Sequence, residues 1–195
     1  MMRPENIKAV MPIGKSSRMK DKPLADFRGK PLFLHGLETM EKIFSEVTLV
    51  CHPELEGRIR ELTKANIITD DLNAGPLGAL YLAAKNSDAE YLFIAACDMP
   101  FLNEEAIRFM CENVAGDGVV LLNDEGLPEP LHAIYRRDFV LDAFPDVKNG
   151  RVSGLIWAGD FVIFPVEKIR RFDPRRDTFK NINTEEELAE ITGKE

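Results

Sequence analysis

The chain has 195 residues, of which 45% are apolar and 30% charged, and its formal net charge is −8. This composition predicts one globular domain over residues 1–195, excludes a disordered chain, and makes a nucleic acid partner a poor expectation because an acidic surface repels phosphates. Three scattered cysteines and the lack of a long apolar segment favour a soluble, cytoplasmic protein with no membrane partner.

Apolar runs alternate with amphipathic segments along the chain. Strands are expected at 7–11, 47–51, 66–69, 90–97, 118–122, 130–135 and 160–166, and helices at 30–44, 53–65, 76–87, 104–114, after Arg136 and at 185–193. Asn103 and Thr184 are expected to cap two of these helices, with Glu187 completing a capping box. The alternation over the first two-thirds predicts an α/β fold with a mostly parallel central sheet and helices on both faces.

Ligands of such sheets bind beyond the carboxyl ends of the strands. The stretch "MPIGKSSRMKDKP" (11–23) follows the first expected strand, and its "GKSS" looks like the end of a P-loop. A P-loop requires a glycine where this chain has Ala9, and Gly14 has no partner glycine for a dinucleotide fingerprint. Both motifs are therefore excluded.

The loop still has the composition of a phosphate site. It holds two serines and four basic residues, Lys15, Arg18, Lys20 and Lys22, in an otherwise acidic chain. Hydroxyls, backbone N–H groups and cationic side chains are the groups that a triphosphate needs. From charge alone, a solvated basic turn is an equally good interpretation.

Five blocks of sequence resemble the molybdenum cofactor guanylyltransferases and their nucleotidyltransferase relatives. "MPIGKSSRMKDKPLADFRGKPLFLHGL" resembles that family's opening, L-A-G-G-x-S-x-R-M-G followed by D-K and G-K-P-L. "AGPLGAL", "AACDMPFL", "LPEPLHAIYRRDF" and "FKNINTEEEL" resemble its later blocks. They occur in the family's order from near residue 7 to near residue 190, so the resemblance spans almost the whole chain.

The resemblance implies a Rossmann-like nucleotidyltransferase fold and an enzyme that joins GTP to the phosphate of molybdopterin cofactor, with Mg²⁺, releasing pyrophosphate. Molybdoenzymes or their chaperones are possible protein partners. Carried over by position, the nucleotide-binding residues are Met11, Pro12, Ile13, Gly14, Ser16, Lys22, Asp70, Gly75 and Asp98. Lys22, Asp98 and Arg18 have catalytic roles, Asp98 is the metal ligand, and Asn181 and Asn183 lie near the cofactor substrate. Asp71 remains an alternative to Asp70.

Nucleotidyl transfer is consistent with these residue types. The attacking phosphate monoester is largely ionised at pH 7, because its second pKa is about 6, and it needs no general base. The barrier lies in bringing two anions together, which positioning, cations and a metal can lower. Asp98 is a hard oxygen ligand of the kind that Mg²⁺ prefers.

The chain departs from the family pattern in the opening loop. Pro12 and Ile13 replace residues of the family's L-A-G-G, and the loop is about one residue shorter before Asp21-Lys22. A proline has no N–H to donate, and isoleucine lacks the smallness of glycine. Three alternatives therefore stay open: a CTP-dependent cytidylyltransferase for the same cofactor, a non-catalytic cofactor-binding homologue, and a sugar-1-phosphate nucleotidyltransferase.

Overall fold

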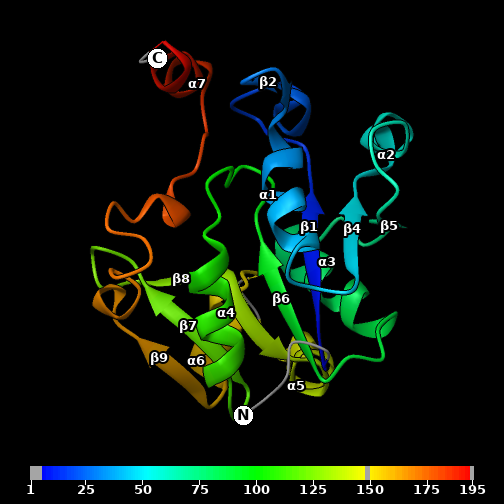
Figure 1. The fold of residues 1–195 in the computed structure, drawn as a ribbon. Coiled ribbons are helices and arrows are strands. Elements are labelled where there is room, and N and C mark those ends of the chain that lie inside the picture. Colours follow the sequence, from blue (N-terminus) through cyan, green and yellow to red (C-terminus); the bar gives the residue numbers. More distant parts are fainter. Residues whose placement is uncertain (1–5, 148–149, 194–195) are drawn as a thin grey trace.

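The computed structural model describes residues 6–147 and 150–193. Within them, seven strands form one sheet in the order β5-β4-β1-β6-β8-β7-β9 (Figure 1). Only β8 runs antiparallel to its neighbours in this described sheet, so the expected mostly parallel sheet is confirmed. The strands are β1 (Ile7–Ile13), β4 (Val47–Cys51), β5 (Asn66–Thr69), β6 (Tyr91–Ala95), β7 (Gly118–Leu122), β8 (Pro128–Arg136) and β9 (Phe161–Phe164).

The first strand extends to Ile13, two residues beyond the expected end at Met11. The carbonyl of Ile13 accepts a hydrogen bond from the N–H of His52 at 2.9 Å, on the β4 side of the strand. Because successive residues of a strand face opposite neighbours, the backbone nitrogen of Pro12 points to the β6 side, where pairing ends at Val10. The missing N–H of Pro12 therefore removes no hydrogen bond between strands.

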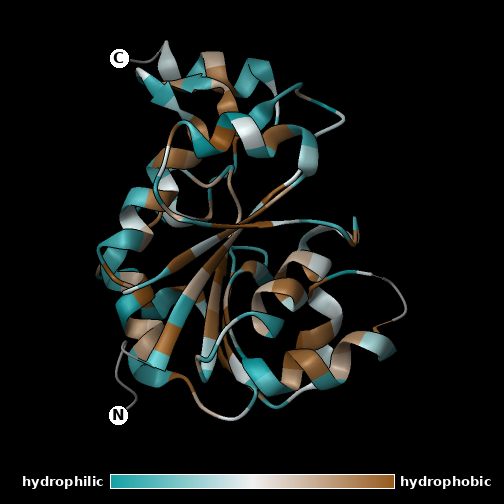
Figure 2. Cartoon of the chain, turned by 90° about the vertical axis from the view of Figure 1, so that its right-hand side faces the viewer, coloured by the Kyte–Doolittle hydropathy of each residue, from teal (hydrophilic) through white to brown (hydrophobic). Residues whose placement is uncertain are grey.

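Helices cover both faces of the sheet, as expected. Figure 2 shows the predominantly hydrophobic strands between two helical layers. One buried cluster packs α1, α2 and α4 against the sheet, and a second packs α3, α5 and α6 against the other face. The helices are α1 (Leu32–Glu41), α2 (Pro53–Arg60), α3 (Gly75–Lys85), α4 (Glu104–Asn113), α5 (Arg137–Ala143), α6 (Ser153–Ala158) and α7 (Glu185–Thr192).

The helix starts show where local sequence decides the structure. The side chain of Asn103 accepts the N–H of Ala106 at 2.9 Å and caps α4, as expected. Thr184 likewise accepts the N–H of Glu187, but the Glu187 carboxylate accepts the N–H of Asn183 and not that of Thr184, so the expected capping box is not formed.

Other helices also differ from expectation, and the helix expected at 53–65 ends at Arg60. The helix expected at 30–44 begins at Leu32 and ends at Glu41, because Lys30–Pro31 form β3, which pairs with β2 (Asp26–Phe27) in a short hairpin. The six-residue α6 was not expected at all.

The carboxyl ends of β1, β4 and β6 point toward the region that holds the β2–β3 hairpin and α7 (Figure 1). A third buried cluster, Phe27, Leu32 and Ile182, joins the hairpin to the segment that leads into α7. The chain passes from β1 to β4 and β5 on one side and returns to β6 on the other, so the strand order reverses beside β1. Such a switch point is the expected place for a ligand. Among the described helices, none has the length and apolarity to cross a bilayer.

Candidate active site

A cavity of about 620 Å³ lies at this edge of the sheet. Its wall comes from the opening loop, the ends of β4 and β6, the β5–α3 connection and the segment before α7. The predicted site residues that line it are Pro12, Ile13, Gly14, Ser16, Arg18, Lys22, Asp70, Gly75, Asp98 and Asn183. The structure thus gathers most of the predicted positions around one space.

Lys22, Asp98 and Asn183 form the polar centre of the cavity. Lys22 lies in a short 3₁₀ turn (Lys22–Leu24) and is only 8% exposed. Its Nζ forms an ion pair with Asp98 Oδ2 and donates a hydrogen bond to Asn183 Oδ1 at 3.0 Å. The N–H of Ile182 donates to the backbone carbonyl of Asp98 at 3.0 Å, which holds the Asn183 segment beside the end of β6.

The second carboxylate oxygen of Asp98, Oδ1, is buried and has no hydrogen-bond partner among the described residues. A buried acceptor without a partner is unfavourable unless a cation or a water satisfies it. Within residues 6–147 and 150–193, no group of three or more His, Cys, Asp or Glu side chains is placed to enclose a metal. A site that offers one carboxylate fits Mg²⁺, which keeps several water ligands and is also coordinated by the phosphates of a substrate.

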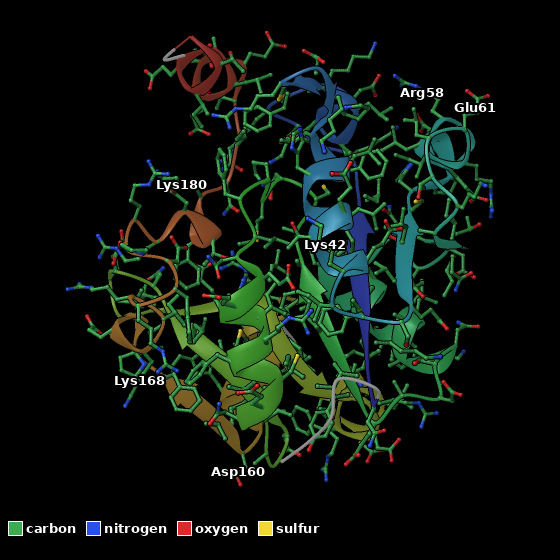
Figure 3. The ribbon with its side chains drawn as sticks, in the orientation of Figure 1. Lys42, Arg58, Glu61, Asp160, Lys168 and Lys180 are labelled. Carbon is green, nitrogen blue, oxygen red and sulfur yellow. The ribbon has the colours of Figure 1, made fainter. Side chains whose placement is uncertain are left out.

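Two solvent-exposed ion pairs link the opening loop to α2. Lys15 pairs with Glu54, and Arg58 Nη1 pairs with Asp21 Oδ2 at 2.6 Å; Figure 3 labels Arg58 on α2. The hydrogen bond from Arg58 lowers the pKa of Asp21, so this carboxylate is charged at neutral pH. By contrast, the exposed Arg18 guanidinium makes no hydrogen bond or ion pair with the described part of the chain. Arg18 is therefore available to an anionic ligand, whereas Lys15 is already engaged.

Gly14 and Gly75, the two predicted glycines, favour glycine for different physical reasons. Gly75 starts α3 with φ +63°, a left-handed conformation that disfavours side chains. At Gly14 the backbone is ordinary and a Cβ would meet no protein atom within 4 Å. Because Gly14 lines the cavity, a side chain at this position would obstruct a bound ligand.

Of the two alternatives Asp70 and Asp71, only Asp70 lines the cavity. Its Oδ1 accepts the N–H of Asn73 at 2.9 Å.

Two predicted site residues lie outside the cavity wall. Met11 is fully buried and packs beneath Gly36 of α1, because side chains of a strand alternate between faces and its side chain enters the core. Asn181 is exposed and does not line the cavity.

The cavity also has wall residues that the sequence motifs did not single out for a site, among them His52, Asn73 and Cys97. Each follows closely on the carboxyl end of a strand, and that position is the signal that could have indicated them. Burial, followed by the nearby Asp98 carboxylate, raises the pKa of Cys97 to about 12. The thiol is therefore protonated at neutral pH and is not a nucleophile.

A family profile, the MobA-like NTP transferase domain, matches residues 13–155, which is more than half of the chain. The chain belongs to the MobA-like nucleotidyltransferases. This confirms that it is a nucleotidyltransferase of the kind that the sequence blocks indicate. In the MobA-like chain the matched region contains most of the cavity wall, and Asn183 lies outside it.

The MobA-like chain is 31% identical over 193 residues to a Methanosarcina acetivorans protein named "Probable molybdenum cofactor guanylyltransferase", with 92% of this chain and 86% of that protein covered. It is 32% identical over 195 residues to a Thermococcus kodakarensis protein of the same name, with 95% and 94% covered. Its fold matches that of molybdopterin-guanine dinucleotide biosynthesis protein A from Archaeoglobus fulgidus at a TM-score of 0.80 and 24% identity, covering 96% and 97% of the two chains.

Proposed function

We propose that this protein transfers GMP from GTP to the phosphate of molybdopterin cofactor, with Mg²⁺, and releases pyrophosphate. The names of its relatives support the two substrates. The observation that carries the proposal is the Lys22–Asp98–Asn183 cluster, a buried cation and a half-satisfied carboxylate at the end of a central strand in the cavity described above. Most buried polar atoms of a folded protein have a hydrogen-bond partner, so the unpaired Oδ1 of Asp98 at the cavity favours binding of a cation there.

The residues have distinct tasks in this reaction. A phosphate oxygen of the cofactor attacks the α-phosphorus of GTP, a new P–O bond forms, the bond to the bridging α–β oxygen breaks, and the electron pair leaves with pyrophosphate. The Lys22 ammonium and the Arg18 guanidinium neutralise charge on the transferred and leaving phosphates. Asn183 holds Lys22 in place from the far end of the chain. No side chain needs to remove a proton.

Asp98 is the residue that would hold the metal, through the unpaired Oδ1. Mg²⁺ bound there supplies positive charge to the leaving pyrophosphate. Because Lys22 occupies Oδ2, the two oxygens of Asp98 have separate roles: one fixes the lysine, and the other remains open to the cation.

The test is isothermal titration of the protein with GTP and with CTP in the presence of Mg²⁺, followed by measurement of pyrophosphate release with molybdopterin cofactor. We expect GTP to bind more tightly than CTP and pyrophosphate to appear only when the cofactor is present. Tighter binding of CTP would assign the cytidylyl reaction instead. Cofactor binding without pyrophosphate release would favour the non-catalytic alternative, and binding of neither nucleotide would exclude nucleotidyl transfer.

A matched pair of variants links the result to the cavity. Asp70→Asn changes an acid in the cavity wall, whereas Asp71→Asn changes its neighbour outside the wall. We expect the first to weaken GTP binding about tenfold, the loss of one charged hydrogen-bond acceptor, and the second to leave binding unchanged. Equal effects of the two variants would place the nucleoside elsewhere.

A further inference from the structure

His52 lies at the cavity wall, between β4 and α2. It follows β4 directly and is the N-cap residue of α2. Its Nδ1 accepts the backbone N–H of Glu54 at 3.2 Å, and His52 is one of the residues that line the cavity. None of the proposed steps uses this side chain.

The cap hydrogen bond determines which ring nitrogen carries the proton. A neutral imidazole has one donor nitrogen and one acceptor nitrogen, and Nδ1 is the acceptor here. Nε2 therefore carries the hydrogen, and it has no partner among the described residues. His52 thus offers the cavity one hydrogen-bond donor whose orientation is fixed by the start of α2.

The order of the strands places His52 on the nucleoside side of the cavity. Asp98 and Lys22, the proposed phosphate end, lie at β6, and His52 lies at β4, with only β1 between them. Adjacent strands are about 4.8 Å apart, so the two ends are separated by about 10 Å. With its α-phosphate near Lys22, a nucleotide can span this distance, its ribose past Gly14 at the end of β1 and its base toward His52.

We propose that His52 is a base-specificity residue that donates a hydrogen bond from Nε2 to O6 of guanine. This inference rests on the function proposed above. Guanine presents O6 as an acceptor, whereas cytosine and adenine present an amino group at the corresponding edge. A fixed N–H group facing an amino group leaves two donors opposed and unpaired, which selects against both of these bases.

The experiment compares GTP with the triphosphate of 2-aminopurine riboside, which lacks both O6 and the N1 hydrogen of guanosine. Both are titrated with Mg²⁺ into the wild-type protein and into His52→Ser and His52→Ala. Serine is among the best N-cap residues, and its hydroxyl ends well short of the position of Nε2, so His52→Ser keeps the hydrogen bond to Glu54 while it removes the ring N–H; His52→Ala removes both. Circular dichroism melts report whether α2 remains capped.

We expect the wild type to bind GTP about tenfold more tightly than the analogue, and His52→Ser to bind both with the same, weaker affinity and an unchanged melting temperature. His52→Ala should show the same loss of discrimination and a lower melting temperature. Retention of the tenfold preference by His52→Ser would overturn the role of His52 while leaving the proposed reaction intact. A wild type that prefers CTP would also overturn it, and a wild type that binds no nucleotide would overturn both proposals.

Discussion

Removing Lys22 should destabilise the fold as well as abolish the reaction. Its Nζ has two partners, Asp98 and Asn183, and the side chains of the ion pair are only 10% and 15% exposed. Loss of one partner from a buried ion pair costs about 3–5 kcal/mol. Because this pair borders a cavity that water can enter, we take the lower limit, about 3 kcal/mol, for Lys22→Met. For a chain of this size, that lowers the melting temperature by about 6–12 °C.

A double-mutant cycle measures the coupling free energy between Lys22 and Asp98. Asp98→Asn keeps an acceptor for Lys22 and should cost about 2 kcal/mol. The variant carrying both changes should lose about 3 kcal/mol, not the sum of 5, since neither buried charge is then left alone. Urea unfolding followed by circular dichroism at pH 7 measures all four proteins. Additivity within about 0.5 kcal/mol would refute the claim that the pair is coupled.

Activity should behave differently from stability in the same cycle. Each single change should lower pyrophosphate release at least about 100-fold, the loss typical of one electrostatic catalytic group, and the double variant should recover none of it. Arg58→Met is the control, because it breaks a solvent-exposed ion pair with Asp21. Such pairs contribute little, so its melting temperature and activity should match the wild type.

Three further predictions follow from the geometry. Gly14→Val should leave the melting temperature unchanged, because no protein atom lies near the added side chain, and weaken GTP binding at least about tenfold in titration calorimetry; a destabilised variant would contradict the open surroundings of Gly14. Asn183→Ala should lower pyrophosphate release at least about tenfold, because Lys22 loses its anchor, while Asn181→Ala stays within about twofold of the wild type; equal rates for the two variants would be inconsistent with their positions. Burial lowers the pKa of His132 from 6.5 to about 4, so between these values the unfolded chain binds a proton that the folded chain excludes. Stability should therefore fall as pH falls from 6.5 to 4, by up to about 3 kcal/mol. Urea unfolding of His132→Gln should show a shallower decline, and an identical pH dependence would argue against the buried neutral imidazole.

Local patterns were sufficient for much of the fold. "NIIT" and "GVVLL" are short apolar runs between polar segments, and both form strands with the expected bounds, β5 and β7. Asn103 could be assigned as a cap because its role depends only on the next few residues. The antiparallel direction of β8 could not be read from its sequence, since a buried strand has the same composition in either direction.

Most residues of the candidate site could be named from the sequence, but the contacts between them could not. The motifs that carry the resemblance indicated Lys22, Asp98 and Asn183, yet no local rule could show that Lys22 bonds to both of the others. The resemblance places Met11 among the nucleotide-binding residues, because it stands at the first position of the family's L-A-G-G. The two extra strand residues place its side chain in the core and leave Pro12 and Ile13 at the cavity.

The bond between Lys22 and Asn183 joins residues that are 161 positions apart. During synthesis, the basic loop, β1, β4, β5 and β6 all leave the ribosome long before Asn183 does. A nascent chain can therefore form most of the sheet while Lys22 and Asp98 still lack their third partner. The proposed nucleotide site is complete only after Asn183 has been translated, so a ribosome that stalls between β9 and this residue would leave a folded sheet in which Lys22 lacks one of its two partners.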